Sequence, residues 1–327
     1  MAVLVTGGAG FVGSHVVERL IERGEEVVVL DDFNAFYDPA IKERNLAAVL
    51  GNPALHVLRG DIADPADVAA AFARAPIRAV MHLAGRAGVR PSVADPLLYA
   101  RTNSQGTLVL LEESRRAGIE RFIFASSSSV YGVTSKVPFV ETDPADRPIS
   151  PYAATKRAAE IACHTYHHLY GLPVTCLRLF TVYGPRQRPD LAIHAFTRDI
   201  LEGREIRLFG DGSSARDYTY VGDIVDGLLA ALDRPEPFGY EIINLGNSHP
   251  VLLRDLIQTL ETVLDRPARL RYVDEQPGDV PLTYADITKA RRLLSYAPSV
   301  SLAEGLARFA AWYTAEYALA AARQTIS

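Results

Sequence analysis

The chain has 327 residues and a formal net charge of −5, with 48% hydrophobic and 22% charged residues. These values are ordinary for a globular protein, and the length suits one large α/β unit or two domains that share a core. No basic tract indicates a nucleic-acid surface, no apolar run could span a bilayer, and the two cysteines match neither a disulfide framework nor a metal-ligand spacing, so we expect no nucleic acid, membrane or metal as a partner.

The first predicted element is a buried parallel strand at residues 2–6, a short apolar run rich in valine. Because it begins at Ala2, it leaves no room for a signal peptide, and we expect a cytoplasmic protein. A turn with Gly7, Gly10 and Gly13 follows and opens into a helix. The glycines allow a tight turn, close approach of a pyrophosphate and close helix–strand packing, so this strand–turn–helix context predicts dinucleotide binding.

The second predicted strand, residues 27–30, ends in Asp31. An acidic residue about 20 residues beyond such glycines holds the adenosine ribose hydroxyls and repels the 2′-phosphate of NADP. The pattern therefore favours NAD, although Asp31 alone could also be a strand-end carboxylate exposed to water.

The alternation of strands and helices continues through the first half of the chain. We predict strands at residues 55–59, 79–83, 121–125 and 174–179, and helices at 65–74, 96–117 and 151–170. This rhythm predicts a doubly wound, Rossmann-like parallel sheet that binds ligands at the carboxyl ends of its strands. The run of four serines at 126–129 follows a strand, so its hydroxyls should lie on the same rim as the glycine turn.

The helix that begins near Ser150 carries the residues with the clearest chemistry. Ser150 is a good N-cap, Pro151 suits the first turn, and Tyr152 and Lys156 lie one turn apart on one face. An ammonium close to a phenol should lower the tyrosine pKa from about 10 and make Tyr152 a general base. Tyr-x-x-x-Lys also occurs by chance on solvated helices, so the prediction depends on the upstream motifs.

Beyond Phe180 the alternation loosens, and a second lobe is expected. We predict helices at residues 191–201, 253–264, 287–294 and 302–318, a strand near 206–209, and a return to the sheet at 217–221 and 242–245. The expected division is an NAD-binding domain at 1–179 plus about 217–246, and a UDP-sugar-binding lobe at about 180–216 plus 247–327.

The chain resembles the extended short-chain dehydrogenase/reductase family in the order of its motifs, which are the glycine turn, Asp31, Asp61, Asn103, the serines and the Tyr152/Lys156 pair. The motifs at residues 180–185, 188–190, 211–218 and 276–281 are most similar to UDP-glucuronate 4-epimerases within its nucleotide-sugar epimerase and dehydratase branch. The resemblance covers residues 2–313. It implies tightly bound NAD that is regenerated in each turnover, and a homodimer formed by the helices near 96–117 and 152–170.

The resemblance also implies roles for matching residues. Asp61 and Ile62 would flank the adenine, Lys156 would reach the nicotinamide ribose, and Ser127 would hydrogen-bond the sugar 4-oxygen. The other implied cofactor contacts are Gly7, Gly10, Phe11, Val12, Gly13, Asp31, Leu83, Ala84, Gly85, Asn103 and Tyr152, and the other implied substrate contacts are Arg90, Ser128, Thr181, Arg188, Arg216 and Asp279. Arg86 and Gln276 depart from the family pattern, because relatives tend to have a neutral residue and arginine there, respectively.

The implied reaction is oxidation and reduction at the same carbon, which interconverts UDP-glucuronate and UDP-galacturonate through a 4-keto sugar. Hydroxyls of Ser127, Ser128 and Thr181 would suit the sugar carboxylate. Ser128 and Ser129 stand where dehydratases and decarboxylases of the family use an acid, which disfavours those activities. A UDP-glucose 4-epimerase, a sugar dehydrogenase and a non-catalytic NAD-sensing module remain as alternatives.

Overall fold

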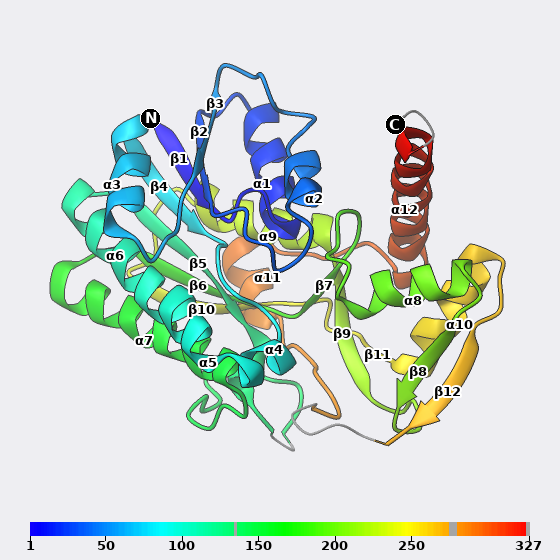
Figure 1. Cartoon of the computed structure of the whole chain (residues 1–327). Helices are drawn as coiled ribbons and strands as arrows, with labels where there is room; N and C mark the ends of the chain where they lie inside the picture. The colour runs from blue at the N-terminus through cyan, green and yellow to red at the C-terminus, as the bar shows by residue number, and fades with distance from the viewer. Residues whose placement is uncertain (134–135, 275–279, 325–327) are drawn as a thin grey trace.

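The computed structural model describes residues 1–133, 136–274 and 280–324. Its largest part is a seven-stranded parallel sheet with helices on both faces, and a smaller part with short strands lies beside it (Figure 1). The strands of the large sheet are β1 (Ala2–Thr6), β2 (Val27–Asp31), β3 (Leu55–Arg59), β4 (Ile77–His82), β5 (Arg121–Ser127), β6 (Val174–Leu179) and β10 (Tyr240–Leu245).

The strand order is β10-β6-β5-β4-β1-β2-β3. The chain builds outward from β1 through β2 and β3 in one direction, and then from β4 through β5 and β6 in the other. The switch point therefore lies between β1 and β4, and in such sheets a ligand binds outside the carboxyl ends of the strands at that point. The predicted doubly wound sheet is confirmed.

Two apolar layers hold the sheet between its helices. Alternate strand residues such as Val3 and Val5 face α1 (Phe11–Glu22), α9 (Val221–Asp233) and α11 (Thr288–Leu294). Their neighbours, such as Leu4, face α3 (Pro65–Arg74), α6 (Gly106–Ala117) and α7 (Pro151–Tyr170). Because successive strand side chains point to opposite faces, strands buried on both sides read as continuous apolar runs, which is why the sequence revealed them.

Local signals fixed several helix ends as predicted. Ser150 caps α7, since its hydroxyl accepts a hydrogen bond from the Ala153 N–H at 3.2 Å, and Asp64 caps α3 in the same way. The short helices α2 (Pro39–Asn45) and α4 (Val89–Ala94) lie in the connections beside the switch point. A 3-10 turn at Ser128–Tyr131 ends the serine run.

The long helix predicted at residues 96–117 is interrupted. It consists of α5 (Pro96–Tyr99), a π-helical segment at Ala100–Gln105, and α6. Gly106 packs against Ile62, and a Cβ at position 106 would lie 2.7 Å from the Ile62 side chain. A π-helical segment often marks a functional position, and here it turns Asn103 inward.

The smaller part has its own sheets and core. Strands β7 (Thr181–Tyr183), β9 (Ala215–Tyr220) and β11 (Pro250–Leu252) form a three-stranded sheet, and β8 (Glu205–Phe209) pairs with β12 (Arg269–Val273). Helices α8 (Ala192–Leu201), α10 (Leu253–Leu264) and α12 (Leu302–Gln324) pack around a third apolar cluster. The prediction that residues 217–221 return to the large sheet is wrong, because β9 pairs with β7 and β11; residues 242–245 do return, within β10.

The C-terminal helix is longer than predicted, since α12 extends past residue 318 to Gln324 through an alanine-rich stretch that favours helix. In the described part of the chain, no helix has the length and apolarity needed to cross a membrane.

Candidate active site

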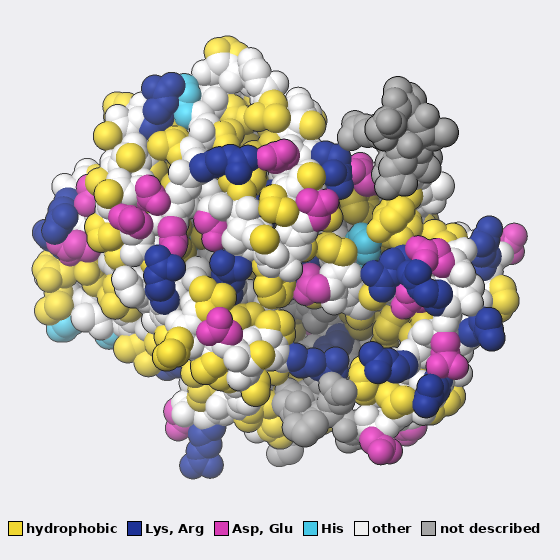
Figure 2. All heavy atoms as spheres, viewed as in Figure 1, with side chains coloured by type: hydrophobic (Ala, Val, Ile, Leu, Met, Phe, Trp, Pro, Cys, Tyr) yellow, Lys and Arg dark blue, Asp and Glu magenta, His cyan; other side chains and the backbone are white. Residues whose placement is uncertain are grey.

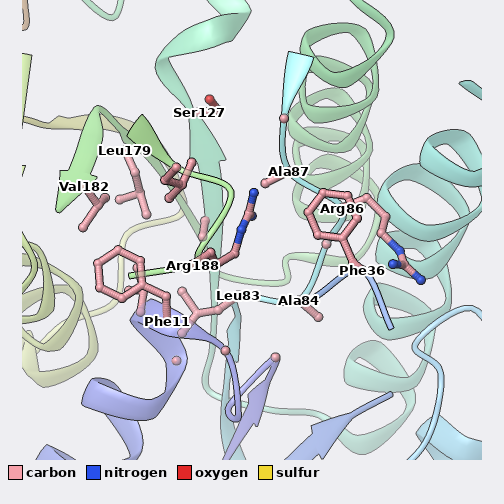
Figure 3. Close-up of a pocket in the computed structure, with 18 of the residues that line it drawn as sticks. Phe11, Phe36, Leu83, Ala84, Arg86, Ala87, Ser127, Leu179, Val182 and Arg188 are labelled. Carbon is pink, nitrogen blue, oxygen red and sulfur yellow. The ribbon is translucent and has the colours of Figure 1, made fainter. Parts of the chain in front are cut away.

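A pocket of about 680 Å³ opens at the carboxyl ends of the large sheet, where the smaller part meets it. The volume lies in the range that is typical of cofactor and ligand sites. Figure 3 shows side chains from both parts around it: Phe11 from α1, Leu83 and Ala84 just after β4, Leu179 from β6 and Val182 from β7. The sequence-predicted residues that line it are Gly7, Gly10, Phe11, Val12, Gly13, Asp31, Asp61, Ile62, Leu83, Ala84, Gly85, Arg90, Ser127, Ser128, Tyr152, Lys156, Thr181, Arg188 and Arg216.

Two glycines of the turn at residues 7–13 leave no room for a side chain. Gly7 has φ +70°, and a Cβ there would lie 2.7 Å from the Ala84 backbone. At Gly13 a Cβ would lie 2.1 Å from the Gly7 carbonyl oxygen. The first turn of α1 contains no acidic residue and its N-terminus opens on the pocket, which makes it suited to an anion such as a pyrophosphate.

Asp31 at the end of β2 is held rigidly. Its carboxylate accepts hydrogen bonds from the Ala9 N–H at 3.1 Å and the Phe33 N–H at 2.9 Å, and it pairs with the Lys42 ammonium at 2.9 Å. Lys42 also lies 3.4 Å from Asp32. Sequence analysis missed Lys42, since a lysine on a short surface helix carries no pattern that relates it to a strand end.

Tyr152, Ser127 and Lys156 meet at the centre of the rim. The Tyr152 and Ser127 hydroxyls are hydrogen-bonded to each other, and Ser127 also donates to Ser129 at 3.1 Å. The Lys156 ammonium donates to the Ala125 carbonyl at 2.8 Å and lies over the Phe124 ring. The Tyr99 and Tyr152 rings pack in a T-shaped arrangement at a centroid distance of 6.3 Å. Together these contacts fix a proton-accepting oxygen beside a hydroxyl donor and a buried cation.

The expected lowering of the Tyr152 pKa is wrong for the protein without ligands. Burial raises the pKa of Tyr152, and this effect exceeds the lowering by the Ser127 hydrogen bond and the Arg188 charge. Burial also lowers the pKa of Lys156 to about 8, against the opposing charges of Glu160 and Cys163. The i, i+4 spacing was correct, but the ammonium points to the Ala125 carbonyl, so it contributes less to the phenol than the spacing predicted.

Three arginines predicted for phosphate contacts all reach the pocket. Arg188 makes a bidentate pair with Asp190 at 2.9 and 2.7 Å, and its guanidinium extends into the middle of the pocket in Figure 3. Arg90 lies over the Phe209 ring at 4.8 Å, and Arg216 donates to the Ala215 carbonyl. Lysine and arginine side chains also gather over α8, β8 and β12 in Figure 2. In this smaller part, Arg198, Arg204, Arg254 and Arg271 are ion-paired with neighbouring carboxylates.

One predicted contact, Asn103, does not join this set. Asn103 is buried behind the wall and is not among the residues that line the pocket; its side chain instead holds the backbone of Arg86 and Thr155 Oγ1. The π-helical segment turns Asn103 inward, and no pattern in the sequence predicts such a segment. Asp279 and Gln276 lie outside the described residues.

A parallel sheet with its switch point beside a tyrosine, a serine and a lysine defines a class of enzymes that move hydrogen between a dinucleotide and a hydroxyl-bearing substrate. Comparison with known proteins narrows the class. The model of the NAD dependent epimerase/dehydratase family matches residues 3–246, and the chain belongs to this family.

Among relatives, UDP-glucuronate 4-epimerase 3 of Arabidopsis thaliana is 46% identical, and the match covers 97% of this chain and 77% of the plant protein. The crystal structure of UDP-glucuronic acid 4-epimerase from Bacillus cereus with UDP-glucuronic acid and NAD is similar, with a TM-score of 0.92, 37% identity and coverage of 97% of this chain and 100% of that one. A UDP-glucose 4-epimerase from Thermotoga maritima with UDP-glucose has a TM-score of 0.89 and 36% identity, covering 97% and 100%.

Proposed function

We propose that the chain is an NAD-dependent 4-epimerase that interconverts UDP-glucuronate and UDP-galacturonate. The observation that carries the proposal is the convergence of Tyr152, Ser127 and Lys156 with Thr181 in the pocket that also contains the glycine turn and Asp31. The similarity to UDP-glucuronate 4-epimerases over nearly the whole chain supports the same activity.

The residues present fit NAD. The Gly7–Gly13 turn would receive the pyrophosphate at the N-terminus of α1, and the Asp31 carboxylate would accept from the adenosine ribose hydroxyls. Lys156 would reach the nicotinamide ribose, and Asp61 and Ile62 would flank the adenine. The chemistry that NAD supplies when bound is reversible acceptance of a hydride.

The chain's own residues control the proton. The Tyr152 oxygen accepts the proton of the sugar 4-hydroxyl and later returns it to the 4-oxygen on the other face of the sugar. Ser127 hydrogen-bonds that oxygen in both states and keeps it within reach of Tyr152. The Lys156 ammonium, fixed by the Ala125 carbonyl, favours the phenolate over the phenol during the transfer. The flat 4-keto sugar turns about its phosphate linkage between the two steps.

Hydroxyl groups favour a uronate as the substrate. Ser128 and Thr181 line the pocket beside Ser127 and offer small donors to a sugar carboxylate. Family members that remove water or CO₂ from the 4-keto sugar use an acid just after the catalytic serine or threonine, whereas this chain has Ser128 and Ser129. The second candidate is a UDP-glucose 4-epimerase, which the similarity to the Thermotoga maritima enzyme supports.

The deciding experiment is incubation with separate UDP-hexoses and UDP-hexuronic acids, with products identified by NMR. Epimerisation of UDP-glucuronate with the higher kcat/KM supports the proposal. A higher kcat/KM for UDP-glucose would assign the second candidate. Accumulation of NADH in step with product would instead identify a net dehydrogenase. If no sugar is converted, the remaining candidate is a non-catalytic NAD-sensing module.

Several finer assignments belong to the same proposal. Arg216 would contact the UDP pyrophosphate, Arg188 and Arg90 other phosphate oxygens, and Asp279 the uridine ribose. The expected division into an NAD-binding domain at 1–179 plus about 217–246 and a UDP-sugar-binding lobe at about 180–216 plus 247–327 stays a prediction. We also propose a cytoplasmic homodimer.

A further inference from the structure

Arg86 follows β4 at the rim of the pocket, and its backbone is fixed on both sides. The Arg86 N–H donates to Asn103 Oδ1 at 2.8 Å, and Asn103 Nδ2 donates to the Arg86 carbonyl at 3.0 Å and to Thr155 Oγ1 at 3.1 Å. Asn103 is buried, and Thr155 belongs to the helix that carries Tyr152. Helix α7, which carries Tyr152, therefore also helps to fix the backbone of Arg86 through Asn103.

The Arg86 side chain bridges two strand ends that are not neighbours. Its Nη1 donates to Asn34 Oδ1 at 2.7 Å, and its Nη2 lies 3.5 Å from Asp32 Oδ2, both just beyond the end of β2. In the sheet, β1 lies between β4 and β2, and the glycine turn begins where β1 ends. An arginine that joins the ends of β4 and β2 must cross the region above that turn. Phe36, from the loop that carries Asp32 and Asn34, lines the same pocket as Arg86 (Figure 3).

The guanidinium also retains capacity for an anion. Arg86 lines the pocket with a side chain that is 16% exposed, and its contacts with Asn34 and Asp32 engage only two of its donors. The nearby Asp31 is already paired with Lys42 at 2.9 Å, so Arg86 is not needed to neutralise it. A guanidinium presents five donors in a fork that suits phosphate oxygens, so donors beyond those that face Asn34 and Asp32 remain for a phosphate.

We propose that Arg86 retains the cofactor: its guanidinium binds the anionic dinucleotide from the side opposite the glycine turn, and its contact with Asn34 closes the channel above it. The proposal rests on the proposed function only for the identity of the cofactor. It predicts slower release of NAD than a neutral side chain at position 86 would allow.

The test measures the release of labelled NAD from the loaded protein into an excess of unlabelled NAD, with no sugar present. Arg86→Gln should raise the dissociation rate about tenfold or more, as expected for the loss of a charge-assisted hydrogen bond. Arg78→Gln is the matched control, because Arg78 lies near the start of β4, at the end of the strand opposite to Arg86, is similarly buried and is paired with Glu25 at 2.8 Å. A dissociation rate for Arg86→Gln within twofold of wild type would overturn the proposal.

A double-mutant cycle tests the bridge itself. Asn34→Ala should also speed release, and the double variant Asn34→Ala/Arg86→Gln should be no faster than Arg86→Gln, because both substitutions open one contact. If the two substitutions increase the NAD dissociation rate in a fully additive way, Arg86 and Asn34 act independently, and the proposed contact between them does not retain NAD. Arg86→Lys keeps the charge but not the fork, so it should lie between wild type and Arg86→Gln, and it provides a second measurement if the glutamine variant does not fold. Since no sugar enters the assay, a wrong substrate assignment leaves its result unchanged.

Discussion

At the residue scale, the proton on Tyr152 depends on opposing effects. Burial raises its pKa, while the Ser127 hydroxyl and the Arg188 charge lower it. Burial has the opposite effect on the lysine, because it lowers the pKa of Lys156 to about 8. The phenol is therefore neutral near pH 7 in the protein without ligands, and the balance shifts toward phenolate only when further positive charge enters the pocket.

Replacing Tyr152 with phenylalanine removes the general base without changing the shape of the ring. Turnover should fall by roughly 10²–10⁴-fold, while the amount of NAD that copurifies stays the same. The control is Tyr166→Phe, which removes a hydroxyl from the same helix outside the pocket, where it contacts Glu112. Initial rates followed by NMR decide the matter, and a Tyr152→Phe rate within a few-fold of wild type would remove this residue from the mechanism.

The hydroxyls of Ser128 and Thr181 should protect the intermediate as well as bind the substrate. Once C4 is oxidised, the C6 carboxylate belongs to a β-keto acid, which loses CO₂ when the C5–C6 bond stands perpendicular to the ketone plane. Ser128→Ala or Thr181→Ala should therefore weaken UDP-glucuronate binding and release some UDP-pentose, detected by NMR. Thr262→Ala on the exposed face of α10 serves as the control. If both pocket variants retain the wild-type KM and form no pentose, the carboxylate contact is wrong.

At the element scale, α7 is clamped to the sheet by a buried ion pair behind the site. Glu160 accepts from Arg178 of β6 at 2.8 and 2.9 Å and from the Ser126 hydroxyl of β5 at 2.6 Å. Burial alone would raise the pKa of Glu160, but the Arg178, Ser126 and Arg157 hydrogen bonds and the Arg178 charge lower it overall. The clamp thus joins the helix of Lys156 to the two strands just before Ser127 and Leu179.

Glu160→Gln should shift the pH dependence in a defined direction. The Glu160 charge raises the pKa of Lys156, against the burial that lowers it to about 8, so loss of the charge lowers that pKa further. Because the reaction needs the ammonium, the alkaline limb of the kcat/KM profile should move to lower pH. In Arg157→Gln the Glu160 carboxylate keeps its charge, and the limb should not move to lower pH. An unchanged limb in Glu160→Gln would show that this carboxylate does not act on Lys156.

The same scale shows where sequence reasoning succeeds and fails. Strands β1, β3 and β6 and helices α3, α7 and α10 were predicted with their observed ends, because apolar runs, caps and prolines are local signals. The π-helical interruption at Ala100–Gln105 was not predicted, since it goes with hydrogen bonds from Asn103 to Arg86 and Thr155, which are distant in the sequence or in another helix. The placement of β9 failed for a similar reason, because strand pairing is decided by distant partners and not by the strand's own residues.

At the scale of the whole molecule, most of the site could be predicted because strand ends gather at one rim. Gly7, Asp31, Ser127 and Tyr152 come from four separate segments, yet the switch-point rule brings them together. Contacts made by long side chains across loops, such as Lys42 with Asp31 and Arg86 with Asn34, could not be predicted. They depend on loop conformation, which the hydrophobic pattern does not specify.

An outward-facing stripe on α7 supports the proposed homodimer. Ala154, Ala158, Ile161, Thr165 and Leu169 recur at helical spacing and are all exposed, although α7 already buries its other face against the sheet. The neighbouring helix α6 adds Leu108, and Tyr170 lies at the end of the stripe. Two adjacent helices with apolar outer faces can pack on the same pair in a second copy, which forms a closed two-fold interface.

A charge in the middle of this stripe should separate the two copies. Ile161 is 53% exposed, and Ile161→Glu places a carboxylate twice in a two-fold interface, so the dimer dissociation constant should rise about thirtyfold or more. Leu50→Glu is the matched control, because Leu50 is 55% exposed but lies between α2 and β3, away from α6 and α7. Light scattering over a concentration series measures the mass. The proposed interface requires a dimeric wild type and Leu50→Glu variant together with a monomeric Ile161→Glu variant. A dimer that persists unchanged in Ile161→Glu would mean that the copies meet through another surface, and a monomeric wild type would mean that the stripe does not form a dimer.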